Sequence, residues 1–350
     1  MKLTHLFRGA TALALFLCVT LTLYVLNVYV EIAVRTILAP GDSEEVIVER
    51  GVQVRRFASQ LEDRGLVSAA THFTVAYISQ YPSSSMQAGL YEINDTDTLL
   101  TLVNKIARGA SLLEKITIIE GWQWKQVKQS LHAHQQFTIS SDRQILQGIN
   151  SKYRQVLRGG KALISLEGLL MPDTYKFKRG ISDHSIVNTA VSQQVHTLMH
   201  EWKSRDRTTN YTTPYQALIV ASLIERESGY PAEYSKIAAV ILNRINVAMP
   251  LQIDAAVIYG MGRHQARLKH SDLKRDTAYN TYTRRGLPPT PIGMPSHAAI
   301  HAALHPFKFG ALYYVLDAAH PYRHIFTSSF AEHRAQKQLQ KQRSKPQSNH

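Results

Sequence analysis

Apolar residues dominate the first thirty positions of the chain. Residues 9–30 hold 22 positions without a charge, rich in Leu, Val and Ala, and such a length crosses the roughly 30 Å hydrocarbon core of a bilayer. Lys2 and Arg8 precede the run, and the positive-inside rule keeps so short a basic tail in the cytoplasm. We predict a cytoplasmic tail over 1–8, a membrane span over 9–30, and the rest of the chain across the membrane. A cleaved signal peptide is the alternative, but the run is long for one.

Behind the span, β-branched runs alternate with segments of helical periodicity. The pattern predicts a strand over 46–51, helices over 54–64 and 70–79, a strand over 88–93 and a helix over 98–108. This strand, helix, helix, strand order resembles a LysM-like wall-binding module. We therefore predict a LysM-like subdomain over 45–110, although the same short pattern occurs in domains that bind no ligand.

Residues 111–330 predict a larger domain that mixes helices with short strands. Strands are expected from position 115, at 174–177 and over 311–318, and helices over 182–203 and 232–248. The predicted fold class is α+β, with helices packed on a small sheet. Beyond position 333 the chain carries five Lys or Arg and no acid, which predicts a basic, disordered tail over 331–350.

One helix organises the larger domain. Residues 217–228 read ALIVASLIERES, and Thr213 and Pro214 before them are an N-cap and a first-turn proline. Gly229 and Pro231 supply the stop.

Glu227 stands in the last turn of this helix. It shares one face with Val220, Leu223 and Ile224, so an apolar stripe ends in a carboxyl group. Desolvation and the negative end of the helix dipole both favour the protonated form, which is a general acid. Glu225 lies about 200° away around the helix, so the two acids are not a facing pair.

Charge and cysteine content narrow the possible partners. The net charge of +14 would suggest nucleic acid for a cytosolic chain, but for an exported one it favours anionic lipid or an anionic wall polymer. Cys18, the one cysteine, lies inside the predicted span. The exported part therefore has no disulfide, no thiol nucleophile and no cysteine metal ligand.

An aromatic and amide cluster follows on a loop. Tyr279, Asn280, Thr281 and Tyr282 precede a Gly- and Pro-rich stretch, which favours a loop. Aromatic faces and amides suit a sugar ligand, but a packed Pro-rich loop has the same composition, so both interpretations stand.

Several segments together resemble a known family. IERES, ILNRI, LQIDAAVIYGMG, and AYNTYT followed by GLPP resemble the signature segments of the endolytic murein transglycosylase (YceG-like) family, as do EGWQWKQV and LEGLLMPDTY. The match runs nearly to position 330. Ala255 departs from the family, in which proline is common after the aspartate, and Arg284 and Arg285 make the loop before GLPP more basic.

The resemblance implies an inner-membrane enzyme with its catalytic domain, residues 111–330, in the periplasm. Such an enzyme cuts MurNAc–GlcNAc bonds within peptidoglycan strands and leaves 1,6-anhydro-MurNAc ends, with peptidoglycan synthases as partners and no nucleic acid. The family's catalytic acid falls on Glu227. We assign substrate contacts to the same segments: Ser228, Asn243, Gln252, Asp254, Tyr259, Tyr279, Asn280, Thr281 and Tyr282.

One carboxyl suffices for this reaction, because the substrate's own 6-hydroxyl replaces water as the nucleophile. Glu227 would act first as the acid that protonates the leaving oxygen and then as the base that deprotonates the 6-hydroxyl. Two alternatives stay open. A hydrolytic muramidase would use Asp254 as a second acid, and a catalytically idle wall-binding scaffold of the elongation machinery would need neither.

The sixteen histidines include three that repeat every fourth residue. His297, His301 and His305 could bind zinc on one helical face. No acid lies nearby in the sequence, and the family that the chain resembles needs no metal. We therefore predict no metal and no cofactor.

Overall fold

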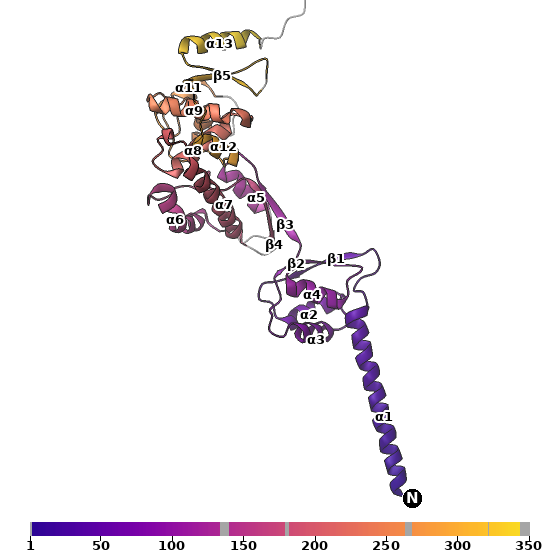
Figure 1. Ribbon diagram of the computed structural model, residues 1–350. Coiled ribbons are helices and arrows are strands. Elements are labelled where there is room, and N and C mark those ends of the chain that lie inside the picture. The colour runs from indigo at the N-terminus through magenta and orange to yellow at the C-terminus, as the bar shows by residue number, and fades with distance from the viewer. Residues whose placement is uncertain (1, 134–139, 179–181, 263–267, 321, 344–350) are drawn as a thin grey trace, which may run out of the picture. The chain divides into compact units, whose positions relative to one another are not determined.

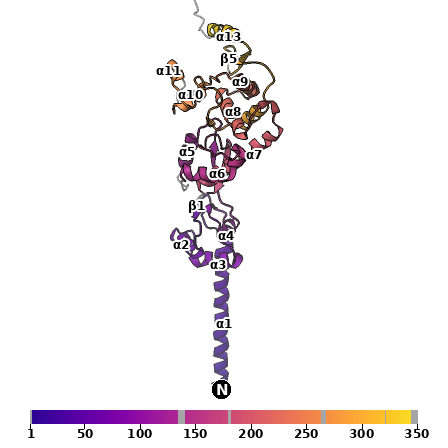
Figure 2. The same cartoon turned by 90° about the vertical axis from the view of Figure 1, so that its left-hand side faces the viewer.

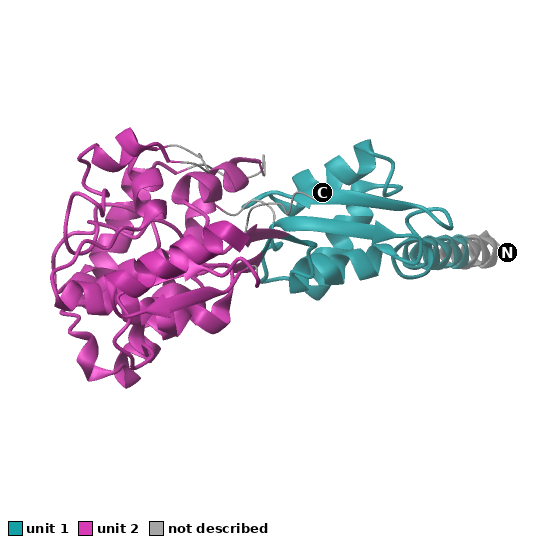
Figure 3. Cartoon of the chain, turned by 90° about the horizontal axis from the view of Figure 1, so that it is seen from above, with its two compact units in different colours: residues 1–114, 176–181 teal, residues 115–175, 182–350 magenta. Residues whose placement is uncertain are grey.

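The structure is a computed structural model that describes residues 2–133, 140–178, 182–262, 268–320 and 322–343 (Figure 1). The chain divides into two compact units. Unit 1 comprises residues 1–114 and 176–181, and unit 2 comprises residues 115–175 and 182–350 (Figure 3).

Unit 1 begins with one long helix. Helix α1 (Lys2–Tyr29) continues into a π-helical turn, η1 (Val30–Val34), and Figure 2 shows α1 as a straight, uninterrupted element. The segment Leu15–Val34, which runs from α1 into η1, is long and apolar enough to cross a membrane, and none of it is buried in the protein. The hydroxyl groups of Thr20 and Thr22 donate to carbonyls one turn earlier, which satisfies them without water. This helix is compatible with the single-pass anchor that the sequence predicts.

The remainder of unit 1 has the predicted order of elements. Strand β1 (Ser43–Val48) pairs antiparallel with β2 (Gly89–Asn94), and α2 (Val54–Asp63), α3 (Ala70–Gln80) and α4 (Leu99–Arg108) complete the unit. The rings of Phe57 and Phe73 meet edge to face inside it, with centroids 5.5 Å apart. The strand, helix, helix, strand order is confirmed. The LysM likeness and any glycan binding stay predictions.

Unit 2 is mostly helical. Its elements are α5 (Trp124–Ala133), α6 (Asp142–Arg158), α7 (Asp183–Ser204), η2 (Arg207–Thr209), α8 (Pro214–Glu227), η3 (Pro231–Glu233), α9 (Tyr234–Asn246), α10 (Asp254–Gly260), α11 (His270–Lys274), α12 (His297–Leu304), β5 (Tyr313–Leu316), β6 (His324–Thr327) and α13 (Phe330–Arg343). Strands β3 (Leu113–Ile118) and β4 (Asp173–Lys178) pair where the two units join in sequence. The described strands form three separate two-stranded sheets, so the α+β class is confirmed, but no single sheet supports the helices.

Helix α8 lies at the centre of unit 2. It packs against α6, α7, α9, α10 and α12, and every residue from Ala217 to Ile224 is buried. A helix that is apolar on all sides needs such an enclosed position. Pro214 occupies the first turn as predicted, but Thr213 makes no side-chain cap. Gln216 instead accepts the Thr212 backbone N–H at 2.7 Å.

The basic tail differs from the sequence expectation. Residues 330–343 form helix α13 rather than a disordered segment, and residues 344–350 lie outside the described part. Ser329 accepts the backbone N–H of Glu332, whose carboxylate faces the N–H groups of Ser328 and Ser329. This is a capping box, and it starts a run of good helix formers. The ring of His333 stacks on Tyr313 of β5, which holds the helix against the sheet.

Candidate active site

Glu227 is the last residue of α8, and the chain turns sharply after it. Ser228 is extended, with φ −142°, and its buried hydroxyl accepts the Tyr230 N–H at 3.1 Å. The serine thereby fixes the turn into η3. The half-buried glutamate side chain is left at the end of a rigid, enclosed helix.

A pocket of about 570 Å³ opens at this helix end. Its walls come from α8, α9, Gln252 and the first residue of α10, the loop at 282, β5 and α13, and β5 and α13 lie at the same end of unit 2 in Figure 1. The lining residues are Glu227, Arg244, Gln252, Asp254, Tyr282, Tyr313, Tyr314, Val315, Phe330, His333, Arg334 and Lys337. Tyrosine rings and cationic side chains therefore surround the glutamate.

Tyr314 is the direct partner of the Glu227 carboxyl. Its hydroxyl donates to Glu227 Oε2 at 2.6 Å. Burial raises the pKa of Glu227 above its ordinary value, and the negative charge of Asp254 raises it further. The Tyr314 hydrogen bond and the charges of His324 and Arg244 act against these effects without reversing them. Glu227 is therefore a carboxyl that retains its proton to higher pH than a free glutamate.

Asp254 begins α10 and faces the same pocket. It is exposed, and its Oδ1 accepts the Tyr282 hydroxyl at 2.6 Å. Gln252, two residues earlier, has a left-handed backbone with φ 53° and donates its N–H to the Thr281 carbonyl at 3.0 Å. These two hydrogen bonds join the segment that carries Asp254 to the loop that carries Tyr282.

Asn280 and Thr281 are buried, and their side chains form hydrogen bonds with backbone groups in and around these two segments. The Asn280 amide donates to the carbonyls of Leu273 and Arg275, and its oxygen accepts the Tyr282 N–H at 2.9 Å. The Thr281 hydroxyl accepts the Ile253 N–H at 2.8 Å. Both side chains act on the backbone that positions Tyr282 and Asp254, and neither lines the pocket at Glu227.

The other predicted contacts lie away from the pocket. Asn243 donates to the carbonyls of Phe309 and Ala311, both at 2.9 Å, and so fixes the chain just before β5. Tyr259 donates to the buried Glu167 at 3.1 Å and meets the ring of Tyr279 with centroids 4.8 Å apart. Of the ten predicted site residues, the structure gathers four at the pocket: Glu227, Gln252, Asp254 and Tyr282.

Sequence reasoning missed several residues of this site. Arg244 interrupts an apolar helix, and the structure buries it with its guanidinium 5.5 Å from the centroid of the Tyr313 ring. Tyr314 lies on β5, which the sequence predicted as a strand without assigning any of its residues to the site. The S-x-x-E pattern at 329–332 was the available signal for α13. In the described residues, the cluster with metal-ligand spacing lies elsewhere, at Glu201, His301 and His305.

The fold and the pocket together indicate the class of protein. The chain is α+β with one apolar N-terminal helix. A glutamate that retains its proton stands at the end of a helix and faces a pocket of aromatic and basic side chains. The family model described as "YceG-like family" matches residues 46–339, and the chain belongs to that family.

Named relatives agree with this membership. The chain is 29% identical over 302 residues to an endolytic murein transglycosylase of Bacillus subtilis, with 83% of each protein covered. It is 27% identical over 301 residues to an endolytic murein transglycosylase of Streptococcus pneumoniae, covering 77% of this chain and 53% of that one. The crystal structure of a YceG-like protein from Listeria monocytogenes aligns with a TM-score of 0.57 and 26% identity, covering 84% of this chain and 99% of that one.

Proposed function

We propose that this chain is a peptidoglycan lytic transglycosylase that cuts inside glycan strands with Glu227 as its acid and base. The observation that carries the mechanism is the pocket in which one proton-retaining carboxyl is held by Tyr314. The relatives named as endolytic murein transglycosylases support the reaction class.

The reaction proceeds in two proton transfers. Tyr314 occupies Oε2 of Glu227, so Oε1 is the oxygen that carries the mobile proton. Glu227 donates that proton to the glycosidic oxygen as the bond to C1 of MurNAc breaks. The carboxylate then takes the proton of the MurNAc 6-hydroxyl as its oxygen bonds to C1. The product is a 1,6-anhydro ring, the acid is regenerated and no water is consumed.

The walls of the pocket suit an anionic glycan. Tyr282, Tyr313 and Phe330 offer ring faces to sugar C–H groups, and Arg334 and Lys337 of α13 bring positive charge to the same cavity. MurNAc carries a lactyl group that ends in a carboxylate or a peptide, and these side chains are placed to bind it. We infer that α13 contributes to substrate binding.

The apolar N-terminal helix indicates where in the cell the enzyme would act. An anchor at Leu15–Val34 with its short basic tail in the cytoplasm would hold both units on the wall side of the inner membrane. There the LysM-like module would bind glycan, and peptidoglycan synthases are the partners that the family resemblance implies.

Asp254 in the same pocket supports one second candidate, a hydrolytic muramidase. Mass spectrometry of muropeptides released from purified peptidoglycan separates the two reactions. The full chain in detergent should produce anhydro-MurNAc ends, and Glu227→Gln should produce them at least about 100-fold more slowly while keeping the same circular dichroism. Reducing MurNAc ends would identify a hydrolase, and release by the glutamine variant at the unmutated rate would refute Glu227 as the acid.

A further inference from the structure

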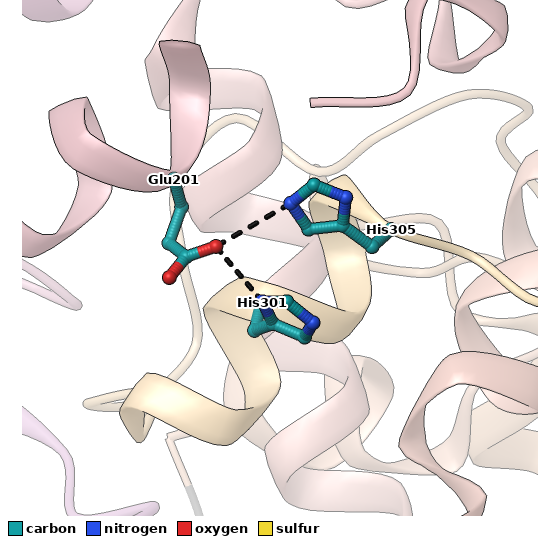
Figure 4. A group of neighbouring side chains, drawn as sticks. All are labelled: Glu201, His301 and His305. Atoms are coloured by element: carbon teal, nitrogen blue, oxygen red, sulfur yellow. Dashed lines mark hydrogen bonds and ion pairs between the residues drawn. The ribbon is translucent and has the colours of Figure 1, made fainter. Parts of the chain in front are cut away.

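A cluster of one glutamate and three histidines joins two helices of unit 2, and none of these four residues lines the pocket at Glu227. Glu201 lies on α7, His297 and His301 lie on α12, and His305 directly follows α12. Glu201 is buried at the base of the cluster, with 7% of its surface exposed. Figure 4 shows the rings of His301 and His305 side by side, both directed at the Glu201 carboxylate.

The distances within the cluster fit a small tetrahedral ion. His301 Nδ1 is 2.8 Å and His305 Nε2 is 3.4 Å from the same oxygen, Glu201 Oε2. Zinc bonds of about 2.0–2.1 Å at tetrahedral angles place neighbouring ligand atoms about 3.3–3.4 Å apart. The three atoms already lie within 4.8 Å of one another. Small side-chain rotations therefore suffice to form a site, with a fourth position open to water.

His297 completes the arrangement from the other side of the carboxylate. Its Nε2 is 2.9 Å from Glu201 Oε1, the oxygen that does not face His301 and His305. A ligating carboxylate normally has such a hydrogen-bonded partner, which fixes its orientation.

We propose that Glu201, His301 and His305 form a zinc site that links α7 to α12. Two imidazoles and one carboxylate are a donor set that zinc accepts. Because α12 packs directly on α8, which carries Glu227, the ion would hold the scaffold of the active site rather than take part in its chemistry. The proposal is independent of the reaction at Glu227.

Cobalt titration of the full chain in detergent, purified without a histidine tag, tests the site directly. CoCl₂ should give visible absorption bands that saturate at one equivalent and disappear when ZnCl₂ is added. His301→Ala and Glu201→Gln should each weaken binding at least 100-fold, and His297→Ala about tenfold, as expected for a partner that only orients a ligand. His301→Asn replaces His301→Ala if the alanine variant does not fold.

His196→Ala is the matched control, because His196 is an exposed histidine on the same helix as Glu201. It should leave cobalt binding unchanged. Zinc should also raise the melting temperature of the unmutated chain and leave that of His301→Ala unaltered. Absence of saturable binding, or binding that persists in both His301→Ala and Glu201→Gln, would overturn the proposal and leave an ordinary hydrogen-bonded cluster.

Discussion

Two carboxyls of unit 2, the half-buried Glu227 and the buried Glu167, have similar electrostatics and different surroundings. Burial raises the pKa of both, to about 7 for Glu167, and each accepts a tyrosine hydroxyl. Glu167 is 3% exposed, and its two oxygens are taken by Trp124 N–H and the Tyr259 hydroxyl. Glu227 instead faces a pocket that a sugar can enter. A raised pKa thus makes a proton donor available only where the carboxyl also meets substrate.

Replacing each acid by glutamine should change the catalytic activity by very different amounts, and this is the largest expected difference between Glu227 and Glu167. Glu227→Gln removes the acid, and general acid catalysis contributes about 10²–10⁴-fold, so we expect a loss in that range. Glu167→Gln retains an acceptor for Trp124 N–H and should keep activity within about tenfold. The rate of anhydro-muropeptide release by the two full-length variants measures this. Equal losses would mean that both acids take part in the reaction.

The buried Glu167 should also make the stability of the chain depend on pH. The folded pKa of Glu167 is above its ordinary 4.5, so its stabilisation is complete below pH 4.5 and is lost as pH rises through about 7. Between pH 4.5 and pH 8 the unmutated chain should lose about 3 kcal/mol of unfolding free energy relative to Glu167→Gln. Denaturant unfolding in detergent at several pH values tests this, and parallel profiles would contradict the buried, protonated state.

Tyr314→Phe should shift the catalytic acid itself. Its hydroxyl hydrogen bond favours the Glu227 carboxylate, so its removal should raise the pKa of Glu227 further. The activity of a general acid falls as it deprotonates, and that falling limb should move up by about one pH unit, since such a bond contributes about 1.5 kcal/mol. Tyr313→Phe is the control, because Tyr313 lines the pocket without bonding to Glu227. If the falling limb of the pH–activity profile does not move in Tyr314→Phe, Tyr314 does not influence the pKa of Glu227.

The sequence predicted those features that neighbouring residues determine. The helix α8, its proline start and the glutamate at its end all follow from short-range spacing, and the structure agrees, although it buries the helix on all sides and not along one stripe. Tyr314 lies 87 positions beyond Glu227, so no local pattern could pair them. For the same reason no local pattern could pair Glu201 with the three histidines, because the fold brings it to His301 from 100 positions away.

Residue type left two interpretations open at the aromatic and amide loop, a sugar site and a packed loop. Asn280, Thr281 and Tyr279 have the chemistry of sugar contacts, and the family resemblance assigned them to the substrate. The amide and hydroxyl instead satisfy buried backbone groups, which must find partners in any loop folded against a core. Tyr282 alone of the four reaches the pocket.

Asp254→Asn provides the smallest and most discriminating change. The charge of Asp254 raises the pKa of Glu227, so its removal should lower that pKa and move the falling limb of activity down by roughly half a pH unit. This direction is opposite to that of Tyr314→Phe. Turnover at the optimum should decrease less than in Glu227→Gln, because asparagine can still accept the Tyr282 hydroxyl. If activity instead falls as far as in Glu227→Gln, Asp254 is a second catalytic carboxyl, and the remaining products should then carry reducing ends.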